Sequence, residues 1–312
     1  MNTLKESVDK FLLIKTASMR SDATIKWYQS ILVSMAESLG ANRDVTTITE
    51  DDVLNYVTSL RNRDMRFVAA MQKPTQQGGL SHETIRSHIR SMKVFWEWAF
   101  KRYKMPNPIE SLALPKPLPR KPKSIEPSDF VKLFNAISDE TCICPIRERA
   151  LIALLADSGA RRAGITSLTI DIDTIRRKGT IIEKGYKQRE ISWTHFTSQL
   201  LDKWLFVRAG VDNDALFISL NDGLPLQPGG INQILNRLKA KAGITGRTNP
   251  HAFRHGFARQ YLLSGGDLGT LSQILGHEST DITTMFYAIF TQQELSRLQD
   301  EHSPLLRMLG DV

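Results

Sequence analysis

A proline-rich, basic segment divides the chain into two parts of unequal length. Residues 114–123, LPKPLPRKPK, contain four prolines and four lysines or arginines. Proline has no backbone N–H and disfavours the helical conformation in the residue before it, so neither a helix nor a central strand can run through this segment. We therefore expect an extended linker at 114–123 between a domain at 1–113 and a domain at 124–312. With 312 residues, the chain is long enough for two hydrophobic cores.

The first domain has the apolar spacing of helices. Thr49 and Ser81 are suitable N-caps for two of them, and Gly40 is a suitable end for another. Between the last two helices, residues 64–79 are expected to form a loop. The segments with apolar residues at every third or fourth position are 7–17, 22–40, 47–63 and 80–103. They predict a small all-helical domain.

The last of these segments, 80–103, is expected to have one buried and one basic face. The side chains expected in the core are Ile85, Ile89, Met92, Phe95, Trp96 and Phe100. Those expected on outer faces are Arg86, His88, Arg90 and Lys93. The outer set would give the helix an exposed positive surface.

The second domain combines helices with one change of period. In residues 168–193, β-branched residues alternate around Lys178–Gly179 and Lys184–Gly185, which predicts a short antiparallel sheet. The expected fold is therefore mainly α, with a small antiparallel sheet in the second domain. Helical patterns occupy 126–137, 147–159, 196–210 and 228–243, and they continue to the end of the chain.

The composition is that of a globular protein, and its charge suits a polyanionic partner only in combination with a binding site. Apolar residues make up 41% and charged residues 24%, and the net charge is +8. Such an excess of lysine and arginine favours binding to phosphates. No apolar run approaches the ~20 residues that cross a bilayer, and the N-terminal residues MNTLKESVDKFLLIK lack a signal-peptide pattern, so we expect a cytoplasmic protein without membrane contact. Cys142 and Cys144 are expected to remain reduced.

The segment 249–267, NPHAFRHGFARQYLLSGGD, has three possible interpretations. His251, Arg254 and His255 stand at i, i+3 and i+4 and so share one helical face. A metal site is disfavoured, because Ala252 replaces the glutamate of the zinc-protease pattern and Arg254 would repel a cation. His255 suits a core histidine beside its apolar neighbours. Arg254 and His251, near a helix that begins at Pro250, suit an anion such as phosphate.

With the segments on either side, this stretch resembles a known family. HAFRH at 251–255 is followed by LGH at 275–277 and by Tyr287, shortly after a Thr-Thr pair. Upstream, ADSGARRAGITSLTIDID resembles an arginine box that usually reads G-x-R-x-x-E-L. IIEKGYKQREISW resembles a lysine hairpin that usually reads G-K-G-x-K-x-R. The order of these motifs resembles that of the tyrosine recombinases, the phage-integrase class, over nearly the whole chain.

The resemblance implies a site-specific DNA recombinase or integrase, of the kind found on mobile elements. Residues 1–113 would be a four-helix, SAM-like core-binding domain, and 124–312 an α+β catalytic domain with a C-terminal tail. It implies strand cleavage through a 3′-phosphotyrosyl link, with no ATP, cofactor or metal. The catalytic residues carried over are Arg161, Lys184, His251, Arg254, His277 and Tyr287, with His255 in support.

The implied chemistry suits these residue types. A phenol with a pKa of about 10 becomes a nucleophile only when its proton is removed or its oxyanion is stabilised. Arg161 and Arg254 would hold the nonbridging phosphate oxygens, and Lys184 would protonate the leaving 5′ oxygen. His251 would act as the acid/base partner, and His277 would hydrogen-bond the phosphate.

The expected partner is double-stranded DNA with a specific site. The resemblance implies a homotetramer on DNA, with the tail docked on a neighbouring protomer, and an accessory bending or directionality factor is possible in this class. The apolar residues of the tail themselves favour core packing within one chain; they are Leu295, Leu298, Leu305, Leu306 and Leu309. The expected host is a bacterium or phage, with the protein at the nucleoid. The candidate DNA contacts are Arg86, Arg90, Lys93, Lys116, Arg120, Lys121 and Lys123.

Two features depart from the family pattern. Gly164 stands where the first box has an acid that orients neighbouring groups, and His277 precedes Tyr287 by ten residues, one more than the commonest interval. We expect reduced rather than absent activity, and we expect Gly164→Glu to preserve or raise cleavage. Two alternatives share the fold: a DNA-binding protein with weakened or lost catalysis, and a type IB topoisomerase or telomere resolvase.

Overall fold

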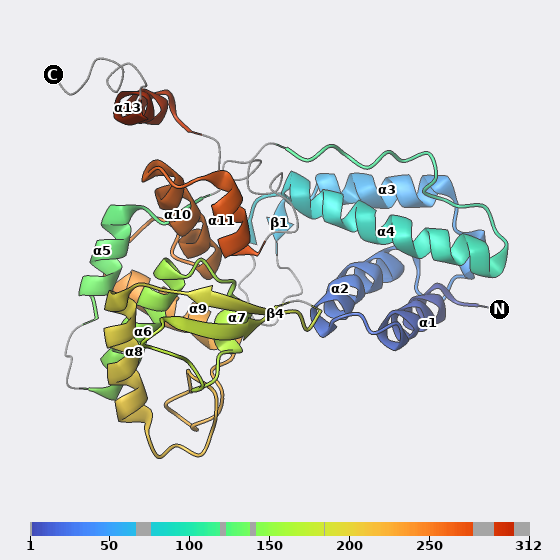
Figure 1. Cartoon of the computed structure of the whole chain (residues 1–312). Helices are drawn as coiled ribbons and strands as arrows, with labels where there is room; N and C mark the ends of the chain where they lie inside the picture. The colour runs from blue at the N-terminus through green and yellow to red at the C-terminus, as the bar shows by residue number, and fades with distance from the viewer. Residues whose placement is uncertain are drawn as a thin grey trace. The chain divides into compact units, whose positions relative to one another are not determined.

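The computed structural model forms two compact units, Met1–Arg120 and Lys121–Val312 (Figure 1). The boundary between them falls inside the proline-rich segment, whose described residues, 114–118 and 123, form neither helix nor strand. The residues that the structure describes are 2–66, 76–118, 123–137, 142–183, 185–276 and 290–302. Among them, no helix has both the length and the apolar character needed to span a membrane.

The N-terminal unit is helical around one apolar core. Its helices are α1 (Leu4–Ala17), α2 (Asp22–Leu39), α3 (Glu50–Arg61) and α4 (His82–Tyr103), with a 3-10 turn at Val45–Thr47. Thr3 and Thr49 form capping boxes that begin α1 and α3, and Ser81 caps α4. In the core, the ring of Phe11 meets the edge of Phe95 at 5.6 Å between centroids.

Two expectations for this unit are wrong. Residues 64–79 are not wholly loop, because β1 (Met65–Arg66) and β2 (Gln76–Gln77) pair antiparallel. Phe100 is 42% exposed rather than buried. The buried stripe of α4 runs through Ile89, Met92, Trp96 and Ala99, and Phe100 lies one position, about 100°, beyond it on the helix.

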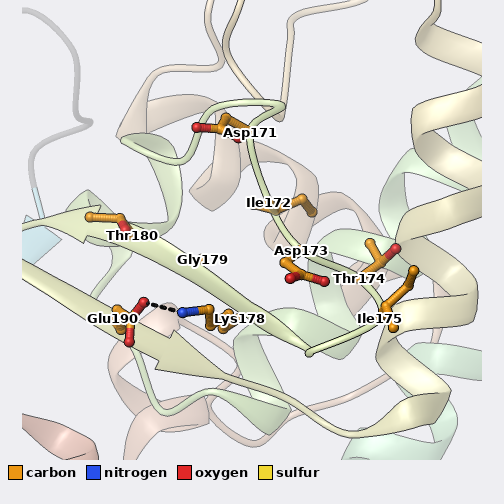
Figure 2. A pocket seen from close by; sticks show the side chains of 9 residues that line it. All are labelled: Asp171, Ile172, Asp173, Thr174, Ile175, Lys178, Gly179, Thr180 and Glu190. Carbon is orange, nitrogen blue, oxygen red and sulfur yellow. Dashed lines mark hydrogen bonds and ion pairs between the residues drawn. The ribbon is translucent and has the colours of Figure 1, made fainter.

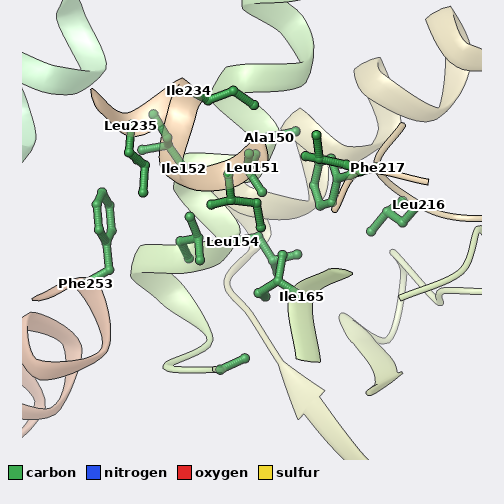
Figure 3. Packing of buried hydrophobic residues seen from close by; sticks show 14 of the residues in the cluster. Ala150, Leu151, Ile152, Leu154, Ile165, Leu216, Phe217, Ile234, Leu235 and Phe253 are labelled. Atoms are coloured by element: carbon green, nitrogen blue, oxygen red, sulfur yellow. The ribbon is translucent and has the colours of Figure 1, made fainter. Parts of the chain in front are cut away.

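The C-terminal unit packs its helices around α6 (Ile143–Asp157). Leu151 and Leu154 of α6 share one core with Ile165, Leu235 and Phe253 (Figure 3). The other elements are α5 (Pro127–Asn135), α7 (Arg162–Thr166), β3 (Lys178–Ile182), β4 (Gln188–Ser192), α8 (His195–Arg208), α9 (Pro228–Lys241), α10 (Pro250–Leu263), α11 (Leu268–Leu275) and α13 (Gln292–His302). The expected mainly helical chain with a small antiparallel sheet is confirmed.

The hairpin of β3 and β4 is the part of this unit that matters most for the site. Its register pairs Ile182 with Gln188 and Lys178 with Ser192, so the turn lies at 183–187. The N–H of Glu183 donates to the carbonyl of Lys187 at 2.8 Å and closes that turn. Gly185 and Tyr186 both have positive φ there. Ile181 and Ile191 face the core, which fixes the hairpin against the helices.

Candidate active site

A tight turn between α6 and α7 places Arg161. Gly159 has φ +59°, and a Cβ at this position would lie 2.6 Å from Cδ1 of Phe257, so only glycine fits the turn. Arg161 follows two residues later as the N-cap residue of α7, in extended conformation. Its side chain is 41% exposed. The sequence therefore ends one helix and turns the arginine outward within four residues.

The Arg161 guanidinium is paired with an acid from the hairpin. Its Nη1 donates to Oε1 of Glu183 at 2.7 Å. Nη2 of Arg189, on β4, donates to the same oxygen at 3.4 Å. Glu183 and Arg189 are 13% and 17% exposed in their side chains, so both are shielded more than Arg161 is. One carboxylate thus joins the arginine of the first motif to the arginine that ends the second.

Arg254 is buried and bonded to backbone carbonyls. On α10 it is 4% exposed, and its two Nη atoms donate to the carbonyls of Gly159 at 2.7 Å and Leu275 at 2.8 Å. Nη1 of Arg189 donates to the carbonyl of Ile274 at 2.5 Å. The last carbonyls of a helix carry partial negative charge, so two arginines stabilise the C-terminal end of α11.

These contacts form a closed ring. It runs from Arg161 through Glu183 and Arg189 to the end of α11, and back through Arg254 to Gly159, two residues before Arg161. Gly276 completes it, because its φ of +64° ends α11 and a Cβ there would lie 2.6 Å from Nε of Arg189. The ring fixes the start of α7, the hairpin, α10 and α11 relative to one another.

His251 lies close to the same arginines. Partial burial lowers its pKa below the ordinary 6.5, and the positive charges of Arg162, Arg254 and Arg161 lower it further. The imidazole is therefore neutral at pH 7, the state in which one nitrogen can accept a proton. His255 is less accessible, and burial with the charges of His251 and Arg254 lowers its pKa to about 4.

The structure brings three of the six predicted catalytic residues together in one region, namely Arg161, His251 and Arg254. The other three, Lys184, His277 and Tyr287, lie outside the residues that the structure describes. Sequence reasoning missed Glu183 and Arg189. The available signals were the arginine that ends the hairpin motif, and an acid where that motif usually begins with glycine.

Gly164 shows why no acid stands at its position. A Cβ there would lie 2.8 Å from Cδ1 and 3.4 Å from Cβ of Ile181, which is fully buried. A glutamate would have to displace this side chain from the core, and overpacking of this kind costs roughly 1–3 kcal/mol. We expect Gly164→Glu to lower stability for this reason, and the expectation that it preserves or raises cleavage stays a prediction.

The candidate DNA contacts differ in availability. Arg90, Lys116 and Lys123 are exposed. Arg86 donates to the carbonyl of Pro115 and pairs with Glu83, and Nζ of Lys93 donates to the carbonyl of Ile109. Arg86 and Lys93 therefore brace their own unit, and Arg90 is the most accessible of the α4 candidates. Arg120 and Lys121 lie outside the described residues.

A shallow pocket beside the open end of the hairpin is distinct from the arginine ring (Figure 2). Asp171, Asp173 and Glu190 contribute three carboxylates to its lining, against one lysine, Lys178. Lys178 and Glu190 are paired at 2.8 Å across the strands (Figure 2). The net negative lining repels phosphate, so this pocket does not serve as the anion site.

The C-terminal helix α13 contributes no buried residue in the described part of the chain, and Leu295 is 46% exposed. Arg259 of α10 forms an ion pair with Glu294, which also caps the start of α13 through Thr291. The interpretation of the tail stripe as core is therefore wrong for Leu295. Leu305, Leu306 and Leu309 lie outside the described residues.

The lowered pKa of His255 predicts a stability that depends on pH. Above pH 6.5 the imidazole is neutral in both states; between pH 6.5 and 4 only the unfolded chain takes up the proton. The free energy of unfolding should therefore fall by up to about 2 kcal/mol between pH 7 and pH 5 and level off below pH 4. Urea unfolding of the wild type and His255→Gln at several pH values measures this decrease. The free energy of unfolding of the variant should fall less with pH, because glutamine does not take up the proton. Equal pH dependence in both proteins would contradict it.

The same argument applies independently in the N-terminal unit. Burial lowers the pKa of His88 to about 4, and the positive charge of Arg63 contributes. Its Nδ1 is buried without a hydrogen-bond partner in the structure as described. The imidazole of His88 is therefore partly buried rather than fully exposed on the outer face of α4. His88→Gln provides a second, spatially separate measurement of the same effect.

Comparison with known proteins identifies the family. A family model described as "Phage integrase family" matches residues 123–294, more than half of the chain. The chain belongs to the phage integrase family. It is a tyrosine-type site-specific recombinase, as its motifs predicted.

Related proteins match over most of their length. The recombinase is 28% identical to tyrosine recombinase XerC of Alcanivorax borkumensis over 310 residues, 97% of this chain and 95% of the relative. It is 31% identical to tyrosine recombinase XerC of Bacillus subtilis over 235 residues, 72% and 76% of the two chains. Among solved structures, the Tn1549 transposon integrase in complex with circular intermediate DNA is similar in fold, with TM-score 0.71, 18% identity and coverage of 97% and 100%.

Proposed function

We propose that this recombinase cleaves and rejoins double-stranded DNA at a specific site through a 3′-phosphotyrosyl intermediate. The observation that carries the proposal is the ring of contacts that fixes Arg161 and Arg254, with His251 beside them. Two preorganised guanidinium groups suit the charge that develops on the nonbridging oxygens of a phosphodiester under attack.

In the proposed steps, one phosphate ester bond forms as another breaks, and each proton has a donor and an acceptor. The Tyr287 oxygen attacks phosphorus, a bond forms between them, and the bond from phosphorus to the 5′ oxygen breaks. Lys184 gives a proton to the leaving 5′ oxygen, while His251 takes the phenolic proton. His277 donates a hydrogen bond to the phosphate. The 5′-hydroxyl of a second strand then reverses the sequence, so neither ATP nor a metal takes part.

The division of labour within the chain is part of the proposal. Residues 1–113 would hold one side of the DNA, with Arg90 as a contact, and 124–312 would carry the chemistry. The basic linker at 114–123 would follow the phosphate backbone. We further propose a homotetramer on DNA in the cytoplasm, with the tail at 291–312 docked on a neighbouring protomer. The exposed Leu295 supports this docking.

Covalent capture from a mixture of DNA sequences tests the proposed function. The purified protein is incubated with nicked duplexes that carry a random segment, in which the nick lets the short 5′-hydroxyl fragment escape and traps the adduct. Protein-linked DNA is isolated under denaturing conditions and sequenced. We expect a shared sequence in the captured strands, and the protein joined to their 3′ phosphates.

Other outcomes identify the alternatives. DNA that is bound but never linked under any condition would indicate a DNA-binding protein without catalysis. Relaxation of a supercoiled plasmid that lacks the captured sequence would indicate a topoisomerase. Hairpin-ended products would indicate a telomere resolvase.

A further inference from the structure

Glu183 has a place in the site that no sequence motif assigned to it. We propose that Glu183 is a positioning residue that orients the Arg161 guanidinium toward the scissile phosphate. In this role it replaces the acid that the family pattern has at position 164. The inference rests on the proposed function, because it concerns how one of the proposed catalytic arginines is held.

The contact geometry gives Glu183 control over Arg161. The two side chains meet at 2.7 Å, and Glu183 is 13% exposed while Arg161 is 41% exposed. A charge-assisted hydrogen bond to a shielded carboxylate is stronger than one to a solvated carboxylate. The acid therefore acts as the fixed partner, and the arginine takes its orientation from it.

Arg161 depends on this one contact. Elsewhere in the described parts of the chain, no group accepts a hydrogen bond from its side chain. Arg254, in contrast, is held by two backbone carbonyls. With only Nη1 engaged by Glu183, the remaining N–H groups of Arg161 stay available for phosphate oxygens. Without the carboxylate, a partly exposed arginine would sample several rotamers.

The backbone makes Glu183 a rigid support. It follows the last residue of β3, and its N–H closes the hairpin turn through Lys187. Arg189 contacts the same carboxylate from β4 and is itself bonded to the carbonyl of Ile274. The acid is thus held from two strands and one helix end.

An acid at position 164 would crowd Ile181, because a Cβ there would lie 2.8 Å from its Cδ1, so the end of that buried side chain would have to move. The two motifs also differ from their usual form in opposite ways. Glycine replaces the acid of G-x-R-x-x-E-L at 164, and glutamate replaces the first glycine of G-K-G-x-K-x-R at 183. This reciprocal exchange is the change expected when an acid moves from one element to a neighbouring one, since α7 packs against β3.

A competing explanation gives Glu183 a structural role only, as the counter-charge of Arg189. That role would lower stability when Glu183 is changed, but it would not make the effect on cleavage depend on Arg161. A double-mutant cycle on the cleavage rate separates the two explanations.

The test uses the full chain and a nicked duplex of the sequence recovered by covalent capture. Single-turnover rates of adduct formation and DNA affinities are measured for the wild type, Glu183→Gln, Arg161→Ala and the double variant. Glu183→Gln should slow cleavage by about tenfold to a hundredfold, because misplacement of a catalytic group such as the Arg161 guanidinium reduces the rate by this order. DNA affinity should stay within about threefold, since the amide keeps the shape of the side chain. Glu183→Asp should give an intermediate rate.

The cycle decides the proposal. In the Arg161→Ala background, Glu183→Gln should slow adduct formation by less than about twofold, because the residue that Glu183 positions is absent. The proposal would be overturned if the rate reductions of the two single variants multiplied in the double variant. It would also be overturned if Glu183→Gln left the rate unchanged. Glu190→Gln is the matched control: it breaks the Lys178 ion pair at the other end of the hairpin and should leave the rate within about twofold. A wild type that forms no adduct would instead refute the proposed function.

Discussion

No covalent protein–DNA complex is expected when Tyr287 is replaced by phenylalanine. The substitution removes only the phenolic oxygen, the atom that would join the protein to the 3′ phosphate, and no other group can take its place in the same position. DNA binding should remain, because the two arginines proposed to hold the phosphate are unchanged. Denaturing electrophoresis of nicked duplex with the wild type and Tyr287→Phe measures the loss, and a mobility-shift titration measures the retained affinity.

Tyr186 provides the matched control. It lies in the hairpin turn next to the predicted catalytic lysine, is 90% exposed, and has the positive φ that a turn requires. Its exposure alone would let it act as an accessible nucleophile. Tyr186→Phe should still form the adduct at a rate within about threefold of wild type. An adduct that persists in Tyr287→Phe and disappears in Tyr186→Phe would assign the nucleophile to the hairpin.

Replacement of Arg254 by methionine is expected to reduce both cleavage and stability. The guanidinium would no longer stabilise charge on the phosphate, and removal of one preorganised donor costs on the order of a hundredfold or more in rate. The carbonyls of Gly159 and Leu275 would also lose a buried donor. Unsatisfied buried groups cost about 1–3 kcal/mol each, so the free energy of unfolding should fall by about 3 kcal/mol. Single-turnover cleavage and urea unfolding measure the two effects.

A second buried arginine separates these effects. Arg208 of α8 is also 4% exposed and donates to the carbonyl of Asn213 at 2.5 Å, and it has no contact with the arginine ring. Arg208→Met should lower stability by about 1–3 kcal/mol, for one carbonyl left without its donor, and leave cleavage within about threefold at a temperature where both variants are folded. If Arg208→Met lost as much cleavage as Arg254→Met, the role of Arg254 would be structural.

The sequence predicted the long amphipathic helices because their apolar positions repeat over several turns. The ends of α2, α4 and α9 were predicted to within two residues in this way. The five residues of α7 are too few to show a period, and β1 and β2 are too short to alternate. The exposure of Phe100 depended on a rotation of one residue around α4, which a count of apolar positions does not resolve.

The site was predictable where a motif fixes residue identity and spacing. Arg161, His251 and Arg254 were found because each lies in a segment with a recognisable pattern. The ion pair of Arg161 with Glu183 joins residues 22 positions apart and arises only when the hairpin packs beside α7. The hydrogen bonds from Arg254 to backbone carbonyls could not be predicted either. Every residue has a carbonyl, so the sequence does not show which one a side chain will contact.

The side chain of Ile181 in the space beside Gly164 also limits how this recombinase can change over generations. An acid at position 164 requires the buried side chain of Ile181 to shift, so its return should be easiest after that isoleucine has become smaller. Loss of Glu183 before that step would leave Arg161 without its partner. We therefore expect substitutions at positions 164, 181 and 183 to be linked. Among descendants of this chain the three positions should covary. A motif search that requires an acid three residues after the first arginine would not detect these proteins.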